Sequence, residues 1–96
     1  MTVHVVARII ARPGAQDALK QILQSLLEPS RQDAGCLSYH LHVNKENPCE
    51  FVMLEEWRDD VAIDAHFGTP HIQSALARTQ GLLAAAPEIL RYQRLG

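Results

Sequence analysis

The sequence predicts a small α+β protein in which helices cover one face of an antiparallel sheet. Two kinds of segment point to this class. In some, apolar residues alternate with a period of two, and in others they recur every three or four residues. Gly or Pro residues separate most of these segments. The chain has 96 residues, which suits one domain and is too short for two, so we expect residues 1–96 to form a single domain.

Four segments are predicted to be strands. Residues 2–12 carry branched apolar side chains on both faces, which is typical of a strand buried on both sides. Residues 36–45 and 51–57 alternate in the same way, and the turn signals at residues 44–48 indicate that they form a hairpin. A last short strand is expected after Pro87.

Three segments are predicted to be helical. Pro29 is expected to kink the first helix or to restart it, and Gly35 to close it as a C-terminal cap. Asp59 or Asp60 can cap a short helix, and the Thr-Pro pair at residues 69–70 can begin the last one. The inward stripe of the first helix is Ala15, Ala18, Leu19, Ile22, Leu23, Leu26 and Leu27. The inward stripe of the last is Ile72, Ala75, Leu76, Thr79, Leu82 and Leu83.

The order strand, helix, strand, strand, helix, strand is that of a ferredoxin-like split βαβ fold with a four-stranded antiparallel sheet. Helices can cover only one face of such a sheet. The other face carries residues such as Val6, Val52 and Leu54, and 47% of the whole chain is hydrophobic. An apolar face of this size favours association. We therefore expect a homodimer in which two sheets pack face to face.

Composition excludes several classes of function. The net charge is -2 and no basic stripe is present, so we expect no binding to nucleic acid. His4, Arg8 and Arg12 interrupt the apolar N-terminal segment, which excludes a signal peptide or a membrane span there and indicates a cytoplasmic protein. Cys36 and Cys49 would lie at opposite ends of the hairpin, more than roughly 20 Å apart, and are expected to be reduced thiols.

Three residues are candidates for chemistry. Glu55 shares a strand face with Met53 and Trp57, so its carboxyl is either desolvated with a raised pKa or paired and inert. His66 is on the inward side of its helix, as a hydrogen-bonded core residue or as a proton-transfer group. His71 opens the next helix, where it can hold a substrate oxygen or simply interact with the helix end.

No cofactor or metal is expected. His40 and His42 form an H-x-H pair on one strand face, but a metal site needs a third protein ligand, and Cys36 lies further along the strand than a compact site would allow. A polar or interfacial strand face is the alternative for this pair. The sequence has no Gly-rich phosphate loop, nucleotide fingerprint, haem-attachment motif or Ser or Cys nucleophile signature.

Four segments together resemble the antibiotic biosynthesis monooxygenase superfamily, in particular its quinol monooxygenase-like members. They are Arg-Pro-Gly at residues 12–14, Gly-Cys-Leu-Ser-Tyr at 35–39, Phe-Val-Met-Leu-Glu-Glu-Trp at 51–57 and Ala-His-Phe-Gly-Thr-Pro-His at 65–71. The resemblance covers almost the whole chain, and its specific part is E-x-W followed by A-H-x-x-T-P-H. It implies a dimeric α+β barrel with a pocket between the sheet and the helices of each subunit.

The resemblance also implies an activity. Members of this family oxidise phenols or quinols with molecular oxygen, without metal or flavin, so the expected partners are a small aromatic substrate and O₂. By resemblance, His66 is the proton-transfer group and Glu55 its orienting or acid partner. Trp57, Tyr39 and Phe51 would line the pocket. His71 would lie at the pocket's mouth.

Other functions within and outside the superfamily stay open. Haem-degrading members carry an Asn on the first strand and a haem-ligating His on the last helix, but those positions fall near Ala7 and Leu76 here, although Trp57 matches. An isomerase that degrades a phosphorylated autoinducer sugar shares the His-x-x-Thr-Pro-His segment. It would need a basic cluster for the phosphate, which Arg8, Lys20 and Arg91 could form if the fold brought them together. A non-enzymatic dimer that binds a small ligand is the third alternative.

Overall fold

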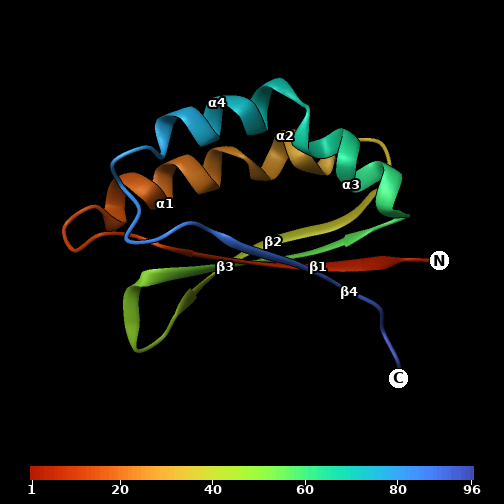
Figure 1. Ribbon diagram of the computed structural model, residues 1–96, viewed down its shortest axis with the longest axis horizontal. Coiled ribbons are helices and arrows are strands. Elements are labelled where there is room, and N and C mark those ends of the chain that lie inside the picture. The colour runs from red at the N-terminus through yellow and green to blue at the C-terminus, as the bar shows by residue number, and fades with distance from the viewer.

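The computed structural model describes residues 1–96 and shows four helices on one side of a four-stranded antiparallel sheet (Figure 1). The strands lie in the order β2-β3-β1-β4. This is the α+β ferredoxin-like arrangement that the sequence predicts. The elements are β1 (Val3–Ile10), α1 (Gln16–Ser25), α2 (Leu27–Arg31), β2 (Cys36–Asn44), β3 (Asn47–Trp57), α3 (Asp60–Phe67), α4 (Pro70–Arg78) and β4 (Glu88–Tyr92). None of the helices has the length and apolar character needed to span a bilayer.

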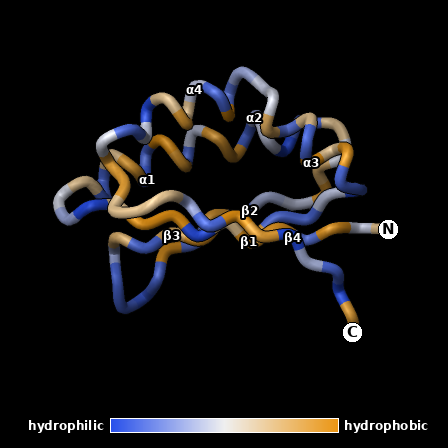
Figure 2. The backbone as a smooth tube through the Cα atoms, in the orientation of Figure 1, coloured by the Kyte–Doolittle hydropathy of each residue, from blue (hydrophilic) through white to orange (hydrophobic).

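The two faces of the sheet have different surroundings. In β1, Val5 and Ala7 are buried against the helices, and their partners across the β1–β3 ladder are Glu55 and Met53. Val6 and its partner Leu54 lie on the opposite face, which no helix covers (Figure 2). We call this second surface the open face. The alternation expected from the sequence therefore places one apolar set in the core and leaves the other at the surface.

The connection between α2 and β2 differs from the prediction. The first helix breaks at Leu26 and restarts as α2 with Pro29 inside it, but α2 already ends at Arg31 with Gln32 as its C-cap. Gly35 is thus not the helix cap. It precedes β2 with a φ of +83°, and a Cβ there would lie 2.6 Å from the Cβ of Ala62. Glycine allows both the left-handed backbone and this close approach to α3.

The C-terminal helix and the hairpin also differ in extent. Helix α4 ends at Arg78, so Leu82 and Leu83 lie beyond it in the loop that leads to β4 and pack against the core from there. Strand β3 begins at Asn47 rather than at residue 51, which reduces the hairpin turn to residues 45–46. Longer ladder pairing between β2 and β3 satisfies backbone groups that the predicted loop would have left to water.

Two predicted helix starts are correct in position. Asp59 is the N-cap of α3, and its carboxylate accepts a hydrogen bond of 2.8 Å from the backbone N–H of Ala62. Thr69 precedes Pro70 at the start of α4, but its hydroxyl donates to the carbonyl oxygen of His66 instead of capping its own helix. Thr69 therefore ties the end of α3 to the start of α4.

Candidate active site

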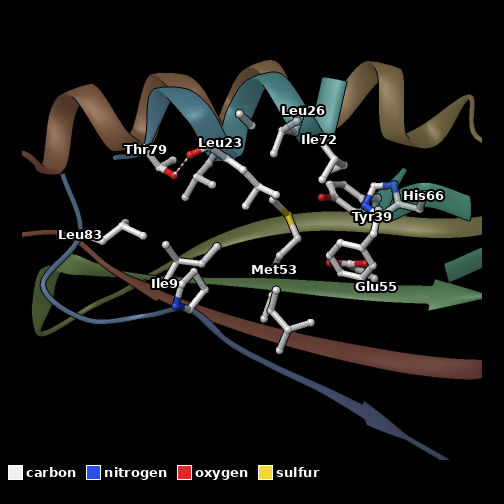
Figure 3. A pocket seen from close by; sticks show the side chains of 16 residues that line it. Ile9, Leu23, Leu26, Tyr39, Met53, Glu55, His66, Ile72, Thr79 and Leu83 are labelled. Carbon is white, nitrogen blue, oxygen red and sulfur yellow. Dashed lines mark hydrogen bonds between the residues drawn. The ribbon is translucent and has the colours of Figure 1, made fainter. Parts of the chain in front are cut away.

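A cavity of about 70 Å³ lies between the sheet and the helices (Figure 3). This volume is several times the roughly 10–15 Å³ that a single water needs. Twelve of its sixteen lining residues are hydrophobic, and no Lys or Arg is among them. The cavity is therefore suited to a small apolar or aromatic molecule and unsuited to a phosphate or carboxylate group.

The polar groups of the cavity gather at one end. Tyr39, Glu55 and His66 lie together there, whereas Ile9 and Leu83 lie at the other end (Figure 3). Thr79 also lines the apolar end, but its hydroxyl is already used, because it donates to the carbonyl oxygen of Leu76 at 3.0 Å. A bound molecule would thus meet hydrogen-bonding side chains at one pole only.

Glu55 is buried on β3, with 7% of its surface exposed. Burial raises the pKa of its carboxyl to about 7, and the indole N–H of Trp57, which donates to Oε1 at 2.8 Å, lowers this pKa in part. Of the two alternatives that the sequence left open, desolvation is the one that the structure supports. A carboxyl with such a pKa can give or take a proton near neutral pH.

His66 is held from α3 at the wall of the cavity and is 2% exposed. Its Nδ1 lies 2.7 Å from Oδ2 of Asp33. Because a carboxylate oxygen only accepts hydrogen bonds, Nδ1 carries the ring proton and Nε2 keeps its lone pair. Burial lowers the pKa of His66, and Asp33 partly opposes this effect. The imidazole is therefore neutral at pH 7, with Nε2 available as a base.

Asp33 is the site residue that the sequence analysis missed. It belongs to the turn between α2 and β2, and Oδ2 accepts from His66 and also lies 2.9 Å from Nε2 of His71. The hydroxyl of Thr69 lies 3.2 Å from the same nitrogen of His71. The only signal in the sequence is an acidic residue two positions before Gly35, and a single residue in a turn forms no periodic pattern.

Aromatic rings enclose the imidazole of His66. Its ring centroid lies 4.6 Å from that of Trp57, 5.5 Å from Tyr39 and 5.4 Å from Phe67. Burial raises the pKa of the Tyr39 phenol, with a smaller contribution from the nearby Glu55 carboxyl, so its hydroxyl keeps its proton. The ring of His66 is thus fixed by packing on its faces and by Asp33 at its edge.

The structure brings together most, but not all, of the predicted site residues. Tyr39, Glu55 and His66 line the cavity. Trp57 is buried behind them, where its indole N–H donates to Glu55 and its ring packs against that of His66. Phe51 packs in the core and His71 contacts Asp33. Trp57, Phe51 and His71 are therefore close to the cavity but do not line it.

The other histidines of the sequence analysis lie elsewhere. His40 and His42 pair with Leu54 and Val52 on the open face, on the far side of the sheet from the cavity. They are exposed there. The H-x-H pair therefore does not contribute to this site.

The fold and the cavity define a class of small α+β proteins with an apolar pocket and a buried histidine paired with an aspartate. The model of the family described as "Antibiotic biosynthesis monooxygenase" matches residues 2–78, and the chain belongs to this family. It is 37% identical over 81 residues to "Putative monooxygenase Rv0793" of Mycobacterium tuberculosis, which covers 84% of this chain and 79% of that protein.

Two further comparisons show similarity over nearly the whole chain. The chain is 32% identical over 89 residues to an uncharacterised protein of Synechocystis; the match takes in 93% of this chain but spans only 60% of that protein's length. The crystal structure of PA3566 from Pseudomonas aeruginosa superimposes with a TM-score of 0.94 at 37% identity, covering 99% of this chain and 95% of that one. The resemblance inferred from the four sequence segments is thus confirmed.

Proposed function

We propose that the protein is a cofactor-independent monooxygenase that oxidises a small phenol or quinol with molecular oxygen. The observation that carries the proposal is the free Nε2 of His66, held by Asp33 at the polar end of an otherwise apolar cavity. Membership of the family, and the name of the mycobacterial relative, support a monooxygenase-type activity.

The reaction balances without an external reductant. A quinol and O₂ give a hydroxyquinone and one water: a ring C–O bond forms, the O–O bond breaks, and a ring C–H bond is lost. All four electrons that reduce O₂ come from the quinol, two from its oxidation to the quinone and two from the hydroxylated carbon. An electron-rich aromatic is therefore required.

The polar end of the cavity provides the proton transfers that this reaction needs. Nε2 of His66 takes the proton of the substrate hydroxyl, since the resulting anion gives an electron to O₂ more readily than the neutral phenol. Asp33 stabilises the imidazolium that forms. Glu55, with its pKa of about 7, supplies a proton to reduced oxygen at the same end. The apolar remainder of the cavity excludes water from the reactive intermediate.

The cavity disfavours two of the alternatives, the sugar-phosphate isomerase and the haem-degrading enzyme. A phosphorylated sugar would need cations, but none lines the cavity, and Arg8 and Arg91 are paired with acidic residues elsewhere. Ala7 and Leu76 do line the cavity, at the positions where haem-degrading members carry an Asn and a haem-ligating His, and neither side chain here is polar or can bind iron.

Oxygen uptake by the metal-free protein with a panel of quinols tests the proposal. We expect uptake with at least one quinol, and a loss of about 100-fold or more in kcat for His66→Ala. His42→Ala, which removes an exposed histidine of the open face, is the matched control and should retain the activity. If no quinol supports uptake, the monooxygenase proposal is wrong. Turnover without oxygen would favour an isomerase, and binding without turnover a ligand-binding dimer.

We also propose that the open face binds a second copy of the chain. Leu54 and Leu90 are 42% and 44% exposed there. Arg8 and Glu50, two charged groups of this face, pair at 2.8 Å within the same copy, so self-association would not leave either of these charges unpaired. Size-exclusion chromatography with light scattering should give a dimer for the natural chain and a monomer for Leu54→Arg. A natural chain that stays monomeric at high concentration would refute this.

A further inference from the structure

We propose that Asp33, His66 and His71 form a binding site for a divalent transition-metal ion, and that the bound metal switches off the base at His66. The consequence for catalysis rests on the proposed function, but the binding itself does not. The site lies beside the cavity, where α3, α4 and the turn before β2 meet.

The three side chains already have their ligand atoms close together. Oδ2 of Asp33, Nδ1 of His66 and Nε2 of His71 lie within 4.8 Å of one another, and Oδ2 is 2.7 Å and 2.9 Å from the two nitrogens. With metal–ligand bonds of about 2.1 Å, neighbouring ligand atoms lie about 3.0–3.4 Å apart. Small side-chain shifts would therefore admit an ion at the centre of the three atoms.

A metal can reach this position from solvent. The side chains of Asp33 and His71 are 15% and 21% exposed, whereas His66 is almost fully buried behind them. Two imidazoles and one carboxylate favour Zn²⁺, Co²⁺ or a similar ion over Mg²⁺ and Ca²⁺, which prefer oxygen ligands. Three protein ligands leave a fourth position for water.

Metal binding and base catalysis make opposite demands on His66. In the metal-free protein, Nδ1 carries the proton and donates it to Asp33, so Nε2 is the free base. A metal on Nδ1 needs that nitrogen's lone pair, and the neutral ring must then carry its proton on Nε2. The same change of tautomer turns Nε2 from an acceptor into a donor. Occupation of the site is thus incompatible with proton abstraction in the cavity.

Titration of the metal-free protein with Co²⁺, followed by visible absorption, tests the binding. We expect one ion per chain, and Zn²⁺ should displace it. Because loss of a ligand's orienting partner alone costs about 10- to 100-fold in metal affinity, loss of a ligand in His71→Gln or Asp33→Asn should weaken binding by about 100-fold. The double variant His40→Gln/His42→Gln, which removes the exposed histidine pair of the open face, is the control and should bind as the natural chain does.

Two outcomes would overturn the site: no absorption change at millimolar Co²⁺, or binding that is lost in the His40/His42 variant and kept in His71→Gln. Because His71 lies at the accessible edge, that variant decides the matter even if Asp33→Asn fails to fold. Correlation of the His66 ring nitrogens and protons by NMR should show the Nδ1–H form without metal and the Nε2–H form with Zn²⁺; an unchanged tautomer would refute the switch. A protein that binds Co²⁺ but consumes no oxygen would leave the site standing and the monooxygenase proposal wrong.

Discussion

Replacing Glu55 by Gln removes the one buried carboxyl of β3, and the effect on stability should depend on pH. The pKa of this carboxyl is raised from an ordinary value of 4.5 to about 7 in the folded protein. Between these values the folded state holds a proton that the unfolded chain has lost, so the free energy of unfolding falls as the pH rises. The contribution of this carboxyl to the free energy of unfolding is fully present below about pH 4.5 and is lost as the pH rises through about 7. Gln cannot titrate, so the variant lacks this loss.

The size of the effect follows from the pKa difference. At about 1.4 kcal/mol for each pKa unit, a difference of about 2.5 corresponds to about 3 kcal/mol. Other groups also titrate in this range. His66, whose pKa is lowered by burial, has the opposite trend, because the unfolded chain takes up its proton first as the pH falls. The difference between the natural chain and Glu55→Gln cancels that contribution.

Urea unfolding at pH 5 and pH 8, at one fixed protein concentration, measures this difference. Relative to Glu55→Gln, the natural chain should be less stable at pH 8 than at pH 5 by about 2.5 kcal/mol, because the carboxyl of the unfolded chain is already mostly ionised at pH 5. Glu56→Gln is the matched control, because Glu56 is the next residue of β3 but lies half-exposed on the open face, 3.6 Å from His4. An exposed pair is worth roughly 0–1 kcal/mol, so its pH dependence should stay within that range of the natural chain's. A difference for Glu55→Gln that is equal at both pH values would refute the reasoning.

Two further changes test the neighbourhood of the site. Asp33→Asn should lower kcat for oxygen uptake by about 100-fold with little change in KM. The amide can present its NH₂ to Nδ1 of His66 and so favour the tautomer that carries its proton on Nε2, which is not a base. An unchanged kcat in the folded variant would contradict the role of Asp33. Gly35→Ala should lower the free energy of unfolding by about 3 kcal/mol, because it strains a left-handed backbone and also brings a Cβ against Ala62. Gly14→Ala is the control, because Gly14 has a φ of +91° but nothing within 4 Å of the added Cβ. Its free energy of unfolding should fall by only about 1 kcal/mol in the same urea titration. Equal losses in the two variants would show that the contact with Ala62 costs nothing.

The strand faces were predictable because a period of two is a strictly local property. Met53, Glu55 and Trp57 share a face in the sequence and share it in the structure, whatever the rest of the chain does.

Helix ends were less predictable. Leu82 and Leu83 continue the apolar spacing of α4, yet Gly81 adopts a φ of +81° just before them and the chain turns toward β4. Spacing alone does not distinguish a helical stripe from a loop that packs on the same core.

Asp33 could not be predicted, because its role depends on contacts between parts of the chain that are distant in sequence. It lies 33 residues before His66 and 38 before His71. The sheet order decides the matter: β2 lies beside β3, so the turn that enters β2 meets the helix that follows β3. The backbone N–H of Arg58 donates a hydrogen bond of 2.8 Å to the carbonyl oxygen of Gly35, which joins the turn before β2 to the segment after β3. An acidic residue in the turn before one strand is thereby placed against a histidine on the helix after the next.

The pair Glu55–Glu56 shows how far the fold determines the chemistry. The two residues have the same side chain and adjacent positions on β3, but one faces the cavity beside Trp57 and the other faces outward beside His4. A slip of the β1–β3 register by one residue would exchange them and would also bring Leu54 inward and turn Met53 outward. The apolar residues that alternate with the glutamates resist this slip, since Met53 and Trp57 are almost fully buried. The core packing that fixes the register is therefore what makes Glu55, and not Glu56, the carboxyl available to the cavity.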